Sequence, residues 1–230
     1  MNIKPDFLKK IYKYLNEFIK KFKVYSAANN LDIKLEKYLN YKNGFYIEIG
    51  ANDGIEQSNT LFLEKKYNWN GMLIEPSEKF EKLIKNRKNK NFFYNEACCS
   101  FSNRNKKIKF LNLNLMTIAL NLSQNINIKK HIYAGKKREK NNYIFYKKGI
   151  PLNDLLILSK APKIVDFFSL DVEGSELEVL NGIDFNKYKF KFLIVENTNI
   201  KKVKNFLSKK NYYIVKKFDG DYLFSPKGSF

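Results

Sequence analysis

Hydrophobic and polar positions alternate along this chain in a way that predicts strands separated by helices. Short apolar runs, rich in aromatic and β-branched residues, predict buried strands at 45–49, 72–75, 92–96, 165–170 and 190–195. Helical spacing of apolar residues predicts helices at 31–39, 58–66, 77–87, 176–180 and 201–209. Two last strands, 212–216 and 222–224, predict a terminal hairpin. This order predicts an α/β fold with a doubly wound, mostly parallel sheet that contains one antiparallel strand.

Two segments depart from the alternation. Residues 3–23 combine apolar residues at helical spacing with many lysines, so we expect 1–40 to be a helical region that packs on the core. Contact of this basic helix with an anionic membrane surface is the alternative. Within the main domain, 41–230, the segment 100–150 predicts short strands at 107–112 and 143–147 around a polar, basic loop. We interpret this segment as a substrate-binding insertion, with the loop as a lid.

Composition narrows the classes of function. A chain of 230 residues with 44% hydrophobic and 16% aromatic residues is not disordered and forms one domain. The net charge of +20 is spread over lysines throughout the sequence, so it does not favour a nucleic-acid partner. Cys98 and Cys99 are adjacent and therefore poor disulfide partners, which favours a cytoplasmic protein. No apolar run reaches the length of about 18 residues that would span a membrane.

The richest motif is the strand 45–49 followed by a turn that Gly50 and Gly54 bracket. Glycine lets the backbone turn sharply and approach a ligand. Glu75 ends the next strand, where an acid accepts hydrogen bonds from ribose hydroxyls in nucleotide-type folds. The spacing departs from the dinucleotide pattern, and Glu48 and Asp53 would repel phosphates. These acids suit a ribose-bearing cation such as S-adenosylmethionine; a plain strand-to-helix turn with a capping Asp is the alternative.

Several motifs in order resemble the FkbM family of S-adenosylmethionine-dependent methyltransferases. They are 50–54 with 58–61, 69–76, Asn86-Arg87 and the run 169–182, and the resemblance covers about residues 44–224. It implies the Rossmann-like, seven-stranded class I methyltransferase fold and methyl transfer to a hydroxyl of a sugar or another small acceptor. It also implies the residues that hold the cofactor: Glu48, Gly50, Asn52, Asp53, Gly54, Ser58 and Asn59 at its methionine end, Glu75 and Pro76 at the ribose, and Glu96 and Ala97 beside the adenine.

A second acidic cluster follows the later strands. Asp171 and Glu173 lie two residues apart at one strand end, and Glu196 ends the next strand. Three oxygen ligands there would suit Mg²⁺ or Mn²⁺, which lowers the pKa of a bound hydroxyl. Alternatively, Asp171 alone, or His131, is the general base. For Glu173, a favourable place at a helix N-terminus is the structural alternative.

The leading prediction is therefore an O-methyltransferase that acts on a carbohydrate. A nucleic-acid methyltransferase rests on the charge alone and lacks the motifs expected for amino or cap-ribose methylation. A non-catalytic module that binds glycan or membrane through the N-terminal helix and the basic loop is the third hypothesis.

Overall fold

The structure is a computed structural model that describes residues 24–88, 90–123, 126–196 and 199–228. In this part of the chain, a seven-stranded sheet has the order β10-β11-β9-β8-β1-β2-β3. Only β11 runs antiparallel to its neighbours, and it lies between β9 and β10. The strands are β1 (Phe45–Ile49), β2 (Asn70–Ile74), β3 (Phe92–Tyr94), β8 (Ile164–Leu170), β9 (Lys189–Glu196), β10 (Tyr212–Phe218) and β11 (Asp221–Pro226). The predicted doubly wound sheet with an antiparallel hairpin strand is confirmed.

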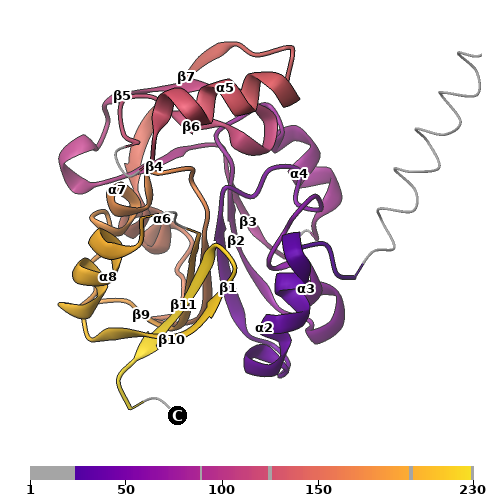
Figure 1. Ribbon diagram of the computed structural model, residues 1–230. Helices are drawn as coiled ribbons and strands as arrows, with labels where there is room; N and C mark the ends of the chain where they lie inside the picture. Colours follow the sequence, from indigo (N-terminus) through magenta and orange to yellow (C-terminus); the bar gives the residue numbers. More distant parts are fainter. Residues whose placement is uncertain (1–23, 89, 124–125, 197–198, 229–230) are drawn as a thin grey trace, which may run out of the picture.

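Helices cover both faces of this sheet (Figure 1). One face carries α2 (Leu31–Leu39), α3 (Leu61–Tyr67) and α4 (Phe80–Asn86), and the other carries α6 (Leu152–Leu158), α7 (Glu176–Leu180) and α8 (Lys201–Ser208). All five residues of β1 are buried because they alternate between two cores. Ile47 packs with the α6, α7 and α8 side, while Tyr46 packs with the α2, α3 and α4 side.

A smaller sheet lies above the main one and has the order β4-β7-β5-β6. It comprises β4 (Ala97–Cys99), β5 (Lys107–Leu111), β6 (Ile118–Ala119) and β7 (Ile144–Pro151), with α5 (Ile128–Arg138) packed beside it (Figure 1). Three-residue 3₁₀ turns complete the described elements, at Ala28–Asn30, Phe101–Asn103 and Asn114–Met116. Both segments in which strands were expected within 100–150 therefore form strands, and they pair with each other through β5 and β7.

Three expectations were wrong in detail. The third strand, predicted over 92–96, ends at Tyr94, and 97–99 form a separate strand that pairs with β7 in the smaller sheet. The loop expected around His131 is the helix α5, whose first turn is capped by the Asn127 side chain accepting from the Lys130 N–H. The helix predicted over 58–66 is α3, and it begins at Leu61 because the Ser58 and Thr60 side chains hydrogen-bond to the Glu48 carboxylate. The helix predicted over 3–23 lies outside the described residues.

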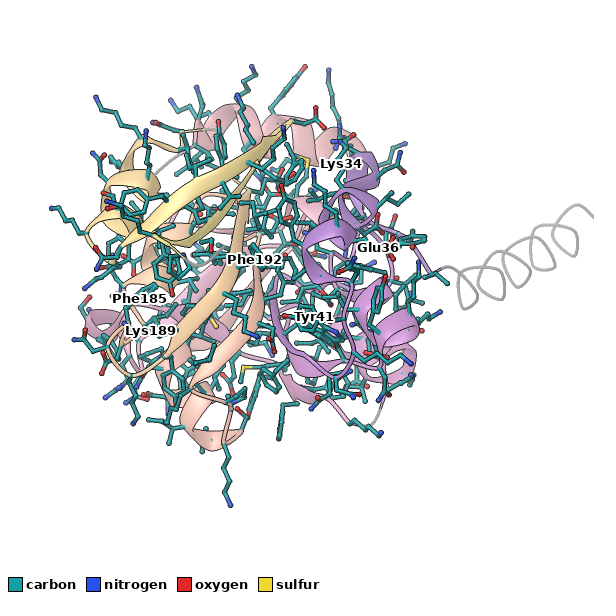
Figure 2. The ribbon with its side chains drawn as sticks, turned by 90° about the horizontal axis from the view of Figure 1, so that it is seen from below. Lys34, Glu36, Tyr41, Phe185, Lys189 and Phe192 are labelled. Carbon is teal, nitrogen blue, oxygen red and sulfur yellow. The ribbon has the colours of Figure 1, made fainter. Side chains whose placement is uncertain are left out.

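Polar contacts join neighbouring strands of the main sheet near their amino ends, on the side of the molecule that Figure 2 shows. Asp166 of β8 accepts hydrogen bonds from the Tyr41 hydroxyl at 2.9 Å and from the Phe45 N–H at 2.8 Å, and Lys191 forms an ion pair with it at 2.6 Å. The polar groups of these residues therefore satisfy one another's hydrogen-bonding capacity.

The described helices are all too short or too polar to cross a lipid bilayer.

Candidate functional site

A cavity of about 300 Å³ opens where the strands of the main sheet end and the smaller sheet begins. In parallel sheets this carboxyl edge is where ligands bind. Nine of the residues predicted for the site line the cavity: Gly50, Asn52, Glu75, Pro76, Glu96, Ala97, Asp171, Glu173 and Glu196. Residues from five different strand ends, far apart in sequence, are thus brought to one hollow.

Asn52 has an unsatisfied side chain at the wall of this cavity. It is 7% exposed and adopts a left-handed conformation at φ +46°. No group in the described part of the chain hydrogen-bonds to either polar atom of its amide. Buried polar atoms are costly unless they are paired, so this amide is suited to bind a polar ligand in the cavity.

Glu75 is held next to Asn52 by two backbone groups. Its carboxylate accepts the Asn52 N–H at 2.8 Å and the Ser77 N–H at 2.8 Å. Burial raises the pKa of Glu75 despite these hydrogen bonds. A carboxylate has about four acceptor positions, so Glu75 keeps lone pairs for ligand hydroxyl groups.

The two glycines of the first turn are also required by close approach of the chain to itself. A Cβ on Gly50, at φ +84°, would lie 2.0 Å from the carbonyl oxygen of Asp171. A Cβ on Gly54, at φ +77°, would lie 2.6 Å from the Leu83 side chain and 2.7 Å from that of Arg87. Gly50 in addition lines the cavity, where the absence of a side chain leaves the backbone open to a ligand. Gly54 is not among the residues that line the cavity.

Glu48 lies beneath the turn and does not line the cavity. Its carboxylate accepts hydrogen bonds from the Ser58 hydroxyl at 2.9 Å, the Asn59 N–H at 2.8 Å and the Thr60 hydroxyl at 2.6 Å. Arg87, whose side chain is fully buried, lies 3.5 Å from it. Glu48, Ser58 and Asn59 thus stabilise the turn through hydrogen bonds to one another. None of the three is among the residues that line the cavity.

Asp53 also bonds inward. Its side chain accepts from the backbone N–H groups of Ile55 at 2.9 Å and Glu56 at 2.7 Å. Asp53 thus closes a local turn through its own side chain; it does not cap a helix, since α3 begins only at Leu61.

The second acidic cluster forms the other wall of the cavity. Asp171 shares a side-chain hydrogen bond with Glu196, and burial together with the carboxylates of Glu196 and Glu173 raises the pKa of Asp171 well above its usual range. Burial and the carboxylates of Glu196 and Glu176 raise the pKa of Glu173 to about 8, against the opposing charge of Arg138. Carboxyl groups with such pKa values take up protons near neutral pH.

Glu173 adopts a conformation that is unusual for its type. Its φ is +52°, and Gly174 follows at +95°. A non-glycine residue held in the left-handed region stores strain, which is concentrated at functional sites. The chain accepts this conformation at the point where the Glu173 side chain reaches the cavity.

His131 approaches the cluster from α5. Its Nε2 lies 2.9 Å from the Met116 carbonyl oxygen, so Nε2 carries the hydrogen and Nδ1 has a free lone pair in the neutral ring. Nδ1 lies 3.7 Å from Oε2 of Glu173. His131 is therefore a neighbour of Glu173 and does not itself line the cavity.

The predicted metal site is not borne out by the arrangement of these groups. Within 24–228, apart from the gaps, no three His, Cys, Asp or Glu side chains are placed to hold a metal ion.

Sequence reasoning missed part of the cavity wall that comes from the smaller sheet. Phe110, Leu122, Arg138 and the turn 114–117 line it. Thr117 and Arg138 fall in the loop interpreted as a substrate lid, but neither was predicted as a site residue. The spacing of Ile128, Ile132 and Gly135 in one helix was the signal that would have placed Arg138.

Comparison with known proteins identifies the chain's relatives. Residues 48–214 match the family described as the methyltransferase FkbM domain. Since this is more than half of the chain, the match shows its family and agrees with the predicted class I methyltransferase fold. No curated protein matches.

Three matches among the solved structures are described as methyltransferases. The FkbM methyltransferase from Methylobacillus flagellatus KT is 13% identical with a TM-score of 0.46, covering 93% of this chain and 59% of its own. TrmK of M. capricolum, solved with S-adenosylhomocysteine, is 13% identical with a TM-score of 0.39, covering 84% of this chain and 66% of its own. Precorrin-6y C5,15-methyltransferase from Geobacter metallireducens GS-15 is 12% identical with a TM-score of 0.38, covering 87% and 93%. This chain thus spans less than two thirds of the first two proteins.

Proposed function

Because this chain belongs to the methyltransferase FkbM family, we propose that it transfers a methyl group from S-adenosylmethionine to a hydroxyl group of a carbohydrate. The family supports S-adenosylmethionine-dependent methyl transfer as the general activity. The hydroxyl acceptor and its carbohydrate nature are our own inference from the resemblance and from the chemistry of the cavity.

The observation that carries the proposal is that groups suited to bind a cofactor and groups suited to accept a proton line the same cavity. At one wall, the unpartnered amide of Asn52 and the carboxylate of Glu75 offer polar contacts to the cofactor. At the other wall, Asp171 and Glu173 have raised pKa values that suit proton acceptance. When bound, S-adenosylmethionine supplies a methyl group on a positively charged sulfur. The chain's own task is to hold the acceptor and remove its proton.

Glu173 is our candidate for the general base. A carboxylate whose pKa is near 8 is a stronger base than an ordinary one, and it matches a working pH near neutrality. The Glu173 carboxylate would take the hydroxyl proton, and the His131 ring lies beside it, with Nδ1 3.7 Å from Oε2. We assign Asp171, bonded to Glu196, to orienting the acceptor.

Calorimetric titration with S-adenosylhomocysteine tests the cofactor half. We expect binding by the wild type and a loss of about tenfold or more in affinity for Asn52→Ala, since one buried polar contact is worth about 1–2 kcal/mol. Asn68→Ala is the matched control, because Asn68 has a similar left-handed φ of +55° and bonds to Asn43 away from the cavity. Absence of binding by the wild type at high micromolar concentrations would overturn the proposal in favour of a non-catalytic module.

Labelled S-adenosylmethionine tests the acceptor half. The protein is incubated with a panel of mono- and oligosaccharides and, separately, with bulk tRNA. We expect the label in a sugar, as a methyl ether identified by mass spectrometry. Label in tRNA and none in any sugar would replace the proposal with a nucleic-acid methyltransferase.

A further inference from the structure

A second hollow of about 400 Å³ lies beside the cavity, between the turn before α4 and the strand β7. We call it the β7 groove. Its lining includes Pro76 and Glu78 from the first side and Asn95, Tyr143, Phe145 and Tyr146 from the second. None of these residues has a part in the chemistry described above except Pro76.

The β7 groove and the cavity share a wall. Pro76 lines both hollows. Phe110, which lines the cavity, stacks on Phe145, which lines the groove, with ring centroids 5.0 Å apart and an angle of 10° between the planes. A ligand anchored in the cavity would enter the groove by extending past Pro76, the residue that lines both hollows.

Aromatic rings give the groove a surface that is unusual for exposed positions. Tyr146 is 48% exposed and Tyr143 is 37% exposed. Lys107 lies 4.3 Å from the centroid of the Tyr146 ring, and Tyr143 shares a hydrogen bond with Glu78 across the groove. Both rings are thus held in place although they remain accessible. Tyrosine offers an apolar ring face together with a polar tip, which matches the C–H face and hydroxyl edge of a pyranose.

The charges in the groove favour a neutral ligand over an anionic one. Glu78 and Glu81 line it, and the lining ammonium, that of Lys147, is hydrogen-bonded to the Asn95 side chain. Asn95 in turn donates to the carbonyl oxygens of Glu75 and Ser77. Both ammonium groups named beside the groove thus have a partner, Lys147 in Asn95 and Lys107 in the Tyr146 ring, which makes them less available to phosphate groups.

We propose that the β7 groove binds the sugar unit next to the one that is methylated, so that the acceptor is an oligosaccharide or larger glycan. This inference rests on the proposed function, because it extends the acceptor of that reaction. It explains why exposed tyrosines lie directly beside the cavity.

Saturation-transfer NMR and calorimetry on the full chain loaded with S-adenosylhomocysteine test the inference with matched pairs of sugars. The pairs are glucose with maltose or cellobiose, galactose with lactose, N-acetylglucosamine with chitobiose, and mannose with mannobiose. We expect at least one disaccharide to bind about tenfold tighter than its monosaccharide, the gain expected for one stacked ring. Equal affinities of monosaccharide and disaccharide in every pair, or no sugar binding at all, would overturn the inference.

Variants locate the effect. Tyr146→Ala is expected to reduce the affinity for the disaccharide to that for the monosaccharide, with the affinity for S-adenosylhomocysteine and the melting temperature unchanged. Tyr133→Ala is the matched control, since Tyr133 is 64% exposed on α5 and does not line the groove. A disaccharide gain that survives in Tyr146→Ala would place the second sugar elsewhere and refute the groove. Failure of S-adenosylhomocysteine to bind counts against the proposed function instead, and the sugar comparison still decides the groove.

Discussion

Replacing Arg87 with Met is expected to destabilise the protein strongly, because Arg87 is a buried cation beneath the turn that Gly50 and Gly54 bracket. Its Nε lies 2.9 Å from Oε2 of Glu64, and its Nη1 lies 3.5 Å from Oε2 of Glu48. The side chains of the three residues are between 0% and 5% exposed. Burial alone would raise the pKa of Glu64, but the charge and hydrogen bonds of Arg87 lower it below its usual value.

The magnitude follows from the charges left behind. Arg87→Met keeps much of the packed hydrocarbon and leaves two buried carboxylates without their cation. Breaking a buried ion pair in this way costs about 3–5 kcal/mol, against a total stability of roughly 5–15 kcal/mol for a domain. For a chain of this size, that loss corresponds to a fall of roughly 6–20 °C in melting temperature.

Urea denaturation followed by tryptophan fluorescence measures the loss. Trp69, the single tryptophan, is buried in the same core as Tyr46 and reports unfolding of this region. The matched control is Arg104→Met, because Arg104 pairs with Asp154 at 2.8 Å with side chains 46% and 28% exposed. Such exposed pairs contribute about 0–1 kcal/mol. Equal losses in Arg87→Met and Arg104→Met would refute the reasoning.

A double variant separates charge from packing. In Arg87→Met with Glu64→Gln, one of the two stranded charges is removed, so the double variant should be more stable than Arg87→Met alone. If the double variant is less stable by the sum of both single losses, unpaired charge is not the cause.

Three further predictions concern single groups. The rate with an identified acceptor should rise with pH and level off above about 8, because the pKa of Glu173 is raised to about 8 and the base acts in its deprotonated form; Glu173→Gln should remove this rise and lower kcat by roughly 10²–10⁴, and a normal rate would exclude Glu173 as the base. Gly50→Ala should lose more than about 1 kcal/mol in thermal denaturation, since its Cβ meets the Asp171 carbonyl and its φ is +84°, whereas Gly220→Ala, with no atom within 4 Å, should change stability by less than about 0.5 kcal/mol; similar values for both would contradict the steric argument. Cys98 and Cys99 are buried free thiols, and burial raises the pKa of Cys99 to about 12, so alkylation by iodoacetamide at pH 8 should be on the order of a hundredfold slower in the folded than in the unfolded protein; equal rates would contradict their burial.

The sequence was sufficient for the centre of the main sheet because β1, β2, β8 and β9 are largely buried apolar runs. The helices α2 and α7 begin and end at the residues predicted, since apolar spacing and end signals agree there. The site residues that end strands, such as Glu75 and Asp171, could be brought together by the rule that parallel strands share a carboxyl edge.

The roles of the turn residues could not be predicted in the same way. Glu48 and Arg87 are 39 residues apart in sequence, and their pairing depends on the packing of α4 against β1. Without knowledge of that packing, the sequence does not tell whether the Glu48 carboxylate bonds within the protein or faces a ligand. The smaller sheet was also difficult, because β4 and β6 are only three and two residues long and β7 is largely exposed or half-buried.

The pairing of β4 with the end of β7 has a consequence for how this chain can vary in length. Ala97 lies opposite Gly149, and Cys99 lies opposite Pro151, so the chain enters and leaves the intervening segment at two neighbouring points. Such a segment can be lengthened, shortened or exchanged with little cost in loop closure, while the strand ends that carry Asn52 and Glu75 stay where they are. Residues 100–148 are therefore the natural segment to exchange between relatives in order to test whether this part of the chain determines the acceptor.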